Sequence, residues 1–327
     1  MRNTYIDFLR FIGLTLIILA HVKAPVWITE LRCFDVPLMV FVSGISFKFS
    51  GGGYFMHRIK RICIPVYSFL IFLFFLVFLS KWIYGYNFYS GKQMLGSLLL
   101  LNNPSIGYVW IFRIFLLMAF VAPFIYWISI RMSKKQSWGF IVAIFVLQAI
   151  LVKCQIQNQS INFLYREYFL YLLGYGVFLF LGMRLRVADE DERKQLLHVS
   201  CVACLASVIY SCLTNNLLSD YKYPPHSIFA IYGASASVIL YLAKDKLSRF
   251  VERQKAAISF IGANSMWIYL WHIPLVFIMN NLLQTNSFWI LRWISVYVMA
   301  IGIYWIQMQI IRFLLQKCPQ LNFKYWI

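Results

Sequence analysis

Three ionisable residues in the first apolar segment are of a type that could do chemistry inside a membrane: Asp7, Arg10 and His21. At about 100° per residue, an α-helix brings Arg10 and His21 to nearly the same face, with Asp7 about 40° from His21. Ionisable groups within a bilayer are costly and indicate a functional site by default. His21 could act as a general base or a nucleophile. The plainer alternative is a structural Asp7–Arg10 pair beside a hydrogen-bonded histidine.

A second group of residues could bind phosphate. The loop-forming run Gly51–Gly53 is followed by Arg58, Lys60 and Arg61. Arg58 and Arg61 are three residues apart, so in a helix they share a face and could hold phosphate groups as a pair. The alternative is an ordinary basic anchor at the cytoplasmic end of a membrane span.

The elements that must position these residues are membrane helices. Of the 327 residues 61% are hydrophobic and 13% are charged, and the chain contains long continuous apolar runs such as 62–79. Soluble domains are about 45–50% apolar and about 25% charged, so this composition excludes a soluble enzyme. It also excludes a disordered chain. Continuous apolar runs argue against a transmembrane β-barrel, whose strands alternate apolar and polar residues.

We therefore predict an all-α polytopic membrane protein, with residues 1–327 forming one integral-membrane domain and no separate soluble domain. The apolar runs predict about ten transmembrane helices, at 5–22, 34–49, 62–82, 107–128, 138–153, 163–183, 197–214, 226–243, 258–280 and 289–315. Segment 91–103 is short enough to be interfacial or re-entrant.

The net charge of +19 is explained by topology. One set of alternate connections carries dense basic clusters at 58–61, 131–135, 184–194 and 244–255. The other set carries only Lys23, Arg32, Lys81, Lys92, Lys153 and Lys222. The positive-inside rule then predicts that both termini are cytoplasmic, as an even number of spans requires. No nucleic-acid partner is expected.

With this orientation, several polar and aromatic residues fall in the outer half of the membrane or at its outer mouth. They include Glu30, Asp35, Trp110, Arg113, Glu167 and His272. Polar groups beside aromatic rings suit a sugar, although aromatic belts also occur at the interfaces of other membrane proteins. His272 is either part of a sugar site or a satisfied core histidine. The seven cysteines are an odd number that does not indicate a disulfide framework, and no histidine spacing typical of a zinc site is present.

The order of these motifs resembles the membrane acyltransferase-3 family. Its first helix carries an arginine, ten intervening residues and a histidine, as Arg10 and His21 do here. Residues 34–44 resemble its second helix, which ends in Ser43-Gly44, and Arg58–Arg61 matches its R-x-x-R motif. Residues 265–275, which include His272, resemble a late-helix pattern.

The resemblance implies a membrane O-acyltransferase that moves an acyl group, commonly acetyl from cytoplasmic acetyl-CoA, onto surface polysaccharide or its lipid-linked precursor. It implies that His21 is the base or acyl carrier and that Arg10, Arg58, Lys60 and Arg61 bind the coenzyme. Asp35 or Glu30 could orient the histidine ring. Glu30, Ser43, Trp110, Arg113, Glu167 and His272 are candidates for binding the acceptor, and Ser43 could equally be a small residue for helix packing.

The resemblance also implies a bacterial cytoplasmic membrane, with lipid, acyl-CoA and glycan as partners and no metal. A competing hypothesis is a transporter of lipid-linked glycans or small acids, since buried charges among many helices fit that function as well. The absence of an internal repeat in the sequence counts against it. The acceptor sugar, the acyl group and the oligomeric state stay open.

Overall fold

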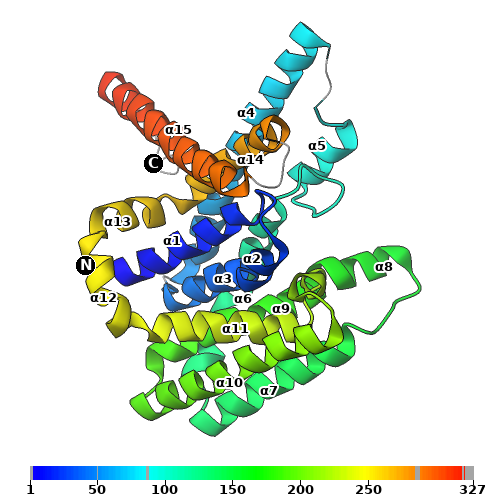
Figure 1. Ribbon diagram of the computed structural model, residues 1–327, viewed down its shortest axis with the longest axis vertical. Coiled ribbons are helices and arrows are strands. Elements are labelled where there is room, and N and C mark those ends of the chain that lie inside the picture. Colours follow the sequence, from blue (N-terminus) through cyan, green and yellow to red (C-terminus); the bar gives the residue numbers. More distant parts are fainter. Residues whose placement is uncertain (1–2, 50, 86–87, 284–287, 319, 321–327) are drawn as a thin grey trace.

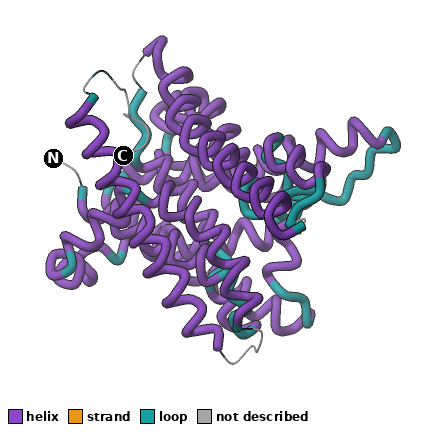
Figure 2. The backbone as a smooth tube through the Cα atoms, turned by 90° about the horizontal axis from the view of Figure 1, so that it is seen from above, coloured by secondary structure: helices purple, strands orange, loops and turns teal. Residues whose placement is uncertain are grey.

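The chain folds into helices that pack around a buried centre. The computed structural model describes residues 3–49, 51–85, 88–283, 288–318 and 320, and these ranges contain helices and loops but no β-strand (Figure 2). Helices satisfy every backbone hydrogen bond within one segment, which is what a lipid environment demands. The predicted all-α class is confirmed.

The described residues up to 187 form nine α-helices and two short turns of other helix types. They are α1 (Thr4–Leu19), α2 (Val26–Leu31), α3 (Asp35–Ile45), the 3₁₀ turn η1 (Gly51–Gly53), α4 (Tyr54–Tyr84), α5 (Gly91–Leu98), α6 (Trp110–Arg131), α7 (Lys134–Leu151), α8 (Gln159–Leu164), the π-helical turn η2 (Tyr165–Phe169) and α9 (Leu170–Val187).

The described part of the chain after residue 187 adds six α-helices and one 3₁₀ turn. They are α10 (Glu190–Thr214), η3 (Leu218–Lys222), α11 (Ser227–Leu242), α12 (Lys244–Arg253), α13 (Lys255–Ala263), α14 (Ser265–Leu282) and α15 (Trp289–Lys317). In Figure 1, α7, α9, α10 and α11 form one side of the molecule, α1, α3 and α6 lie in the middle, and α4, α14 and α15 lie on the other side.

Each of the ten predicted segments contains a helix, but fewer helices are long and apolar enough to cross a membrane. Among the described residues six helices meet that condition, or up to eight if each of two bent pairs counts as one span. The helices α1 and α3 are shorter, with 16 and 11 residues. Nearly all of α3 is buried among other helices, so its length is set by protein neighbours rather than by the thickness of the bilayer.

The centre of the fold depends on a close crossing of α3 and α9. A Cβ atom added to Gly44 would overlap the carbonyl oxygen of Leu179, and one added to Gly182 would overlap the carbonyl oxygen of Phe41. Small residues of this kind allow two membrane helices to approach closely. The crossing holds α3 in place, and Gly44 is one of the two small residues that make it possible.

The predicted helix 258–280 is broken, which corrects the expectation of one continuous span. The helices α13 and α14 meet at an angle of 75°. At the break, the Asn264 side chain donates to the carbonyl of Phe260 over 2.8 Å and accepts from the Tyr304 hydroxyl over 2.9 Å. A side chain that bonds to its own helix backbone competes with the helix ladder. The break therefore lies at Asn264 and not at Pro274, which α14 contains.

The first helix ends earlier than predicted. It stops at Leu19 instead of residue 22, and the amide of His21 donates to the carbonyl of Ile18 in the tight turn that follows. Because Lys23 then adopts a positive φ of 55°, the chain leaves the helix direction directly after His21. The histidine lies at the end of α1 and not within it.

Candidate functional site

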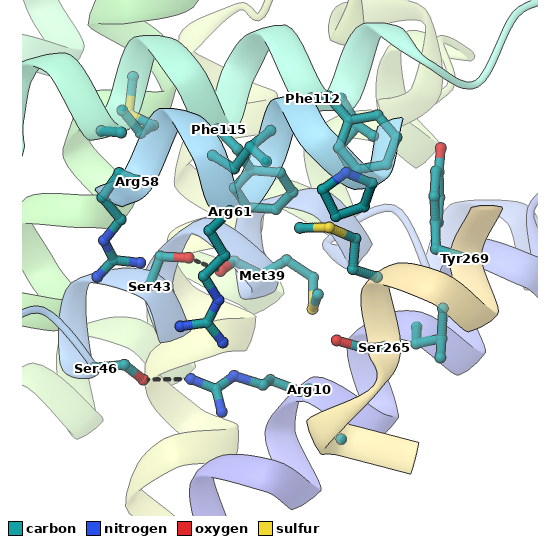
Figure 3. A pocket seen from close by; sticks show the side chains of 18 of the residues that line it. Arg10, Met39, Ser43, Ser46, Arg58, Arg61, Phe112, Phe115, Ser265 and Tyr269 are labelled. Atoms are coloured by element: carbon teal, nitrogen blue, oxygen red, sulfur yellow. Dashed lines mark hydrogen bonds between the residues drawn. The ribbon is translucent and has the colours of Figure 1, made fainter. Parts of the chain in front are cut away.

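A cavity of about 410 Å³ lies between α1, α3, α4, α6 and the α13–α14 break (Figure 3). This volume falls within the range of about 300–1,000 Å³ that is typical of small-molecule sites. Its wall combines apolar residues such as Phe112 and Phe115 with polar residues that come from helices far apart in the sequence. The cavity is the natural starting point for a functional site.

Three arginines gather on one side of the cavity. Arg10, Arg58 and Arg61 all line it, and Figure 3 shows their guanidinium groups on the side away from Tyr269. Arg10 donates to the carboxylate of Asp7 over 3.0 Å and to the Ser46 hydroxyl over 2.9 Å. The predicted Asp7–Arg10 pair is thus present, and it holds an arginine whose side chain is still 29% exposed.

The basic segment that was predicted to precede the third span forms the first turns of α4. Arg58 and Arg61 share the face that borders the cavity, as their spacing predicts, and the guanidinium carbon of Arg58 lies 5.6 Å from the centre of the Tyr54 ring. Lys60 is exposed and is not among the lining residues. His57 and Ser46, which the sequence did not indicate as site residues, also line the cavity.

Neither His21 nor His272 is among the residues that line the cavity, but Tyr269, which does line it, lies beside His272. Ile17 lines the cavity as well, and it precedes His21 by four residues, which is about one helical turn. Ser43 lines the cavity too, and its hydroxyl donates to the carbonyl of Met39 over 2.9 Å. This hydrogen bond lies within α3, so Ser43 offers a small, already bonded surface to the cavity.

His21 is half-buried and belongs to a cluster of rings. Its ring centre lies 4.3 Å from that of Tyr108 and 5.5 Å from that of His272, with the two imidazoles stacked. The ring of Tyr269 is 4.5 Å from that of His272, and its hydroxyl donates to the carbonyl of Tyr108. Tyr269 is therefore both a wall of the cavity and a neighbour of the histidine pair.

His272 is fully buried, and only one of its ring nitrogens is bonded. Its Nδ1 contacts the carbonyl of Tyr269, whereas Nε2 has no hydrogen-bond partner among the described residues. A carbonyl can only accept, so Nδ1 carries the proton and Nε2 carries the free electron pair. The alternative of a fully satisfied core histidine does not fit this geometry.

Asp35 lies in a buried cluster of charges at the start of α3. Its carboxylate accepts from Arg32 over 2.6 Å, from Lys222 over 3.4 Å and from the amide of Val36 over 2.7 Å. Among the described residues no hydrogen bond joins Asp35 to His21. The structure therefore places Asp35 as the partner of two cations, while its predicted role in orienting the histidine stays a prediction.

Glu30, in α2, holds the 3₁₀ turn η3. Its carboxylate accepts from the amides of Leu218 and Ser219 and, over 2.7 Å, from the Ser219 hydroxyl. These residues begin η3, the turn that ends with Lys222. Glu30 therefore fixes the turn from which Lys222 reaches Asp35.

Trp110, Arg113 and Glu167 lie next to one another. Arg113 is buried and donates to Glu167 over 2.5 Å, and Glu167 belongs to η2, the single π-helical turn before α9. Turns of this type are frequent at functional sites. The Trp110 ring lies 5.1 Å from that of Tyr223 and 6.2 Å from that of Tyr171. Trp110 and the Arg113–Glu167 pair thus share Tyr171 as a neighbour, and none of the three lines the cavity with the arginines.

A comparison with protein families shows the family of the chain. The family model of the acyltransferase domain known as Acyl_transf_3 matches residues 3–308. The chain belongs to the acyltransferase-3 family. It is a multi-pass membrane acyltransferase. The matched range includes the residues of the cavity, the histidine pair and the charged residues around Asp35. No curated protein and no solved structure matches the chain.

An acyltransferase needs a donor site, an acceptor site and a group that moves a proton or carries the acyl group between them. Membership of the family favours this use of the buried charges over the transporter hypothesis. Among the described residues no group of three or more histidine, cysteine, aspartate or glutamate side chains is arranged to hold a metal ion.

Proposed function

We propose that this acyltransferase moves an acetyl group from acetyl-CoA to a hydroxyl of a cell-surface polysaccharide or its lipid-linked precursor. One observation carries the proposal: a single cavity has Arg10, Arg58 and Arg61 on one side and ends at Tyr269, beside His21 and His272. Coenzyme A has the matching form, with several phosphates at one end and a reactive thioester at the other.

The arginines suit the phosphate end of the donor. Guanidinium groups bind phosphate through paired, charge-assisted hydrogen bonds, and Arg58 and Arg61 project from neighbouring turns of α4. Arg10, held by Asp7 and Ser46, would bind a phosphate or the pantetheine arm deeper in the cavity. Lys60 is exposed beside them and would contribute charge at the entrance.

The apolar wall suits the pantetheine arm. From the arginines the arm would pass Met39, Phe112 and Phe115, all of which line the cavity, and bring the thioester towards Tyr269. A long, thin acyl carrier needs such a channel because the phosphates stay near water while the thioester must reach a dry site. Exclusion of water protects the thioester from hydrolysis.

His21 would then act by one of two routes. As a general base it takes the proton from the acceptor hydroxyl while the oxygen attacks the thioester carbonyl; the carbon–sulfur bond breaks and the coenzyme leaves as a thiolate. As a nucleophile its nitrogen attacks the thioester first, releasing the thiolate, and the acceptor hydroxyl then takes the acyl group from the imidazole and loses its proton. Both routes require a neutral imidazole at the start.

The acceptor would enter from the side opposite to the arginines. We infer from the distribution of basic residues that both termini and the Arg58 end of α4 face the cytoplasm, where acetyl-CoA is made. Trp110, Arg113, Glu167 and His272 then lie towards the outer surface of a bacterial cytoplasmic membrane. The donor and the acceptor would meet at His21 without either one crossing the membrane.

Turnover of acetyl-CoA by the purified protein in nanodiscs tests this function. Wild type, His21→Ala and Arg58→Ala would be compared with a panel of lipid-linked glycans as acceptors, and release of free coenzyme A would be measured. We expect release to depend on the acceptor, to be lost in His21→Ala, and to need more acetyl-CoA in Arg58→Ala.

Two results would overturn parts of the proposal. Equal turnover by His21→Ala and wild type would remove His21 from the reaction. A wild-type protein that neither binds nor consumes acetyl-CoA would show that the donor assignment is wrong, although the family would still be that of an acyltransferase.

A further inference from the structure

A group of buried polar side chains in the outer neighbourhood has hydrogen-bonding capacity that the described protein does not use. The atoms without a partner are Nε of Arg32, Nε and Nη1 of Arg113, and the hydroxyls of Tyr171 and Tyr175. All four side chains are more than nine-tenths buried. Buried polar atoms are nearly always bonded to protein, water or ligand, so this concentration of unused atoms needs an explanation.

The four residues and Lys222 form one continuous cluster, which we call the outer cationic cluster: Arg32, Lys222, Arg113, Tyr171 and Tyr175. Trp110 connects its parts, because Lys222 Nζ lies 5.7 Å from the Trp110 ring centre and the Tyr171 ring lies 6.2 Å from it. The guanidinium carbon of Arg113 is 5.4 Å from the Tyr171 ring, which in turn stacks on Tyr175 at 6.0 Å.

The unused atoms favour a ligand rich in acceptor oxygens. Guanidinium nitrogens can only donate, and the tyrosine hydroxyls can donate as well. In addition, Arg32 and Lys222 share the single carboxylate of Asp35, while Glu30 gives its oxygens to the amides of η3. Among the described residues Asp35 is the one carboxylate that forms an ion pair with Arg32 or Lys222, so a further anion in contact with these buried cations would be favourable.

The cluster also has a position suited to the acceptor. Tyr223, whose ring lies 5.6 Å from Lys222 Nζ, is 44% exposed, so the cluster has an exposed neighbour. On the inner side, Trp110 is two residues from Tyr108, whose ring packs against that of His21. A group bound by the cluster would therefore lie between the outer surface and the histidine pair.

We infer that the outer cationic cluster binds an anionic group of the acceptor, either a sugar carboxylate or the phosphate of a lipid-linked glycan. This inference rests on the proposed function and narrows its acceptor to an acidic one. Glu30 is then a positioning residue, because it holds the turn that carries Lys222. Trp110 offers an aromatic surface beside the anion, where a sugar ring can pack.

Binding of matched probes to the purified protein in nanodiscs tests the inference without any need for turnover. One pair is a methyl hexuronoside and the corresponding neutral methyl hexoside. The other pair is a short polyprenyl phosphate and its polyprenol. A hydrogen bond to a charged group contributes about 1.5–3 kcal/mol, so we expect at least one anionic probe to bind about tenfold or more tighter than its neutral counterpart.

Variants of Lys222 test whether the anion binds at the outer cationic cluster. Lys222→Met leaves the Arg32–Asp35 pair balanced, and we expect it to lose most of the preference for the anionic probe, whereas Lys222→Arg keeps the preference. Lys153→Met removes an exposed lysine from another connection on the predicted outer side and is the matched control, which should bind like wild type. If Lys222→Met does not fold, the wild-type comparison of the two probe pairs still decides the question.

The outcomes are distinct. Preference for the hexuronoside alone assigns a sugar acid, and preference for the polyprenyl phosphate alone assigns a lipid-linked phosphate. Equal binding of charged and neutral probes in both pairs overturns the inference, as does a preference that Lys222→Met and Lys153→Met leave equally intact. Anion preference without acetyl transfer would refute the proposed function and keep the site, whereas transfer without anion preference would refute only the site.

Discussion

The cavity and the outer cationic cluster of this membrane protein both contain several cationic side chains, but these side chains differ in their exposure and their partners. On the cavity side, Arg58 and Arg61 belong to the first turns of one helix and stay accessible to water. In the outer cationic cluster, Arg32 follows α2 and Lys222 ends η3, and both are buried against Asp35. The first arrangement can release and rebind a large, mobile anion, whereas the second is built into the fold.

Removal of a cation should have different effects in the two regions. An accessible cation that binds a substrate can be removed at a cost in affinity, because water takes its place. A buried cation that shares a carboxylate cannot be separated from the stability of the protein, because its partner is left uncompensated. We therefore expect substitutions on the two sides to differ in kind, with effects on donor affinity on one side and on folding and acceptor binding on the other. His21 lies between the sides and should affect neither property.

The largest effect is expected where the two sides meet. His21→Ala should lower kcat by about 10²–10⁴-fold, the usual contribution of a positioned base, without changing acetyl-CoA affinity. Steady-state kinetics and equilibrium binding of acetyl-CoA measure the two quantities. His198→Ala, which removes an exposed histidine of α10, is the control; a similar loss in both variants would mean that the effect does not come from the site.

The next effect concerns the buried side. Asp35→Ala leaves Arg32 and Lys222 without their carboxylate, and breaking a buried pair in this way costs about 3–5 kcal/mol of stability. Thermal unfolding in detergent should show a clear loss, while Asp245→Ala, an exposed aspartate on α12, should unfold like wild type. An Asp35→Ala protein as stable as the control would show that the outer charges are not part of the fold.

The accessible side should show a smaller effect of another kind. Arg58→Ala and Arg61→Ala should each raise the KM for acetyl-CoA by about tenfold or more, because a hydrogen bond to a charged group contributes about 1.5–3 kcal/mol, with kcat and unfolding temperature nearly unchanged. Initial rates over a range of acetyl-CoA concentrations measure this split. A loss of stability without a change in KM would place these arginines with the buried side.

The smallest effect on the KM for acetyl-CoA is expected at Lys60, which lies in the same helix turn as Arg61. Lys60 is exposed and does not line the cavity, whereas its neighbour Arg61 does. Exposed ion pairs contribute at most about 1 kcal/mol, so Lys60→Ala should change the KM for acetyl-CoA by less than about fivefold. Parallel kinetics of the two alanine variants make the test; equal effects would mean that charge near the entrance matters and the shape of the cavity does not.

Local spacing predicted a large part of the cavity side. The three-residue spacing of Arg58 and Arg61 describes residues on one helix face, and periodicity within one helix is enough to find them. The interval between Arg10 and His21 runs past the end of α1 at Leu19, so helical periodicity does not describe it. The structure brings Arg10, Arg58 and Arg61 to one cavity. The helical class and the approximate positions of the segments followed from composition and apolar runs in the same way.

Contacts between distant segments were beyond such reasoning. Asp35 and Lys222 are separated by 187 residues, and nothing in either local pattern indicates the other. The break at Asn264 depends on the hydroxyl of Tyr304 in another helix, so an apolar run of ordinary length predicted one straight span instead. The short α3 is a similar case, because its length reflects burial by protein and not by lipid.

The most direct test of the account is the sidedness of transfer in proteoliposomes of known orientation, with acetyl-CoA on one side of the membrane and the acceptor on the other. We expect acetyl transfer when acetyl-CoA is on the side of Arg58 and the acceptor is on the opposite side, and no transfer when the two are exchanged. Equal transfer in both arrangements, or transfer only with acetyl-CoA on the side of Lys222, would contradict it.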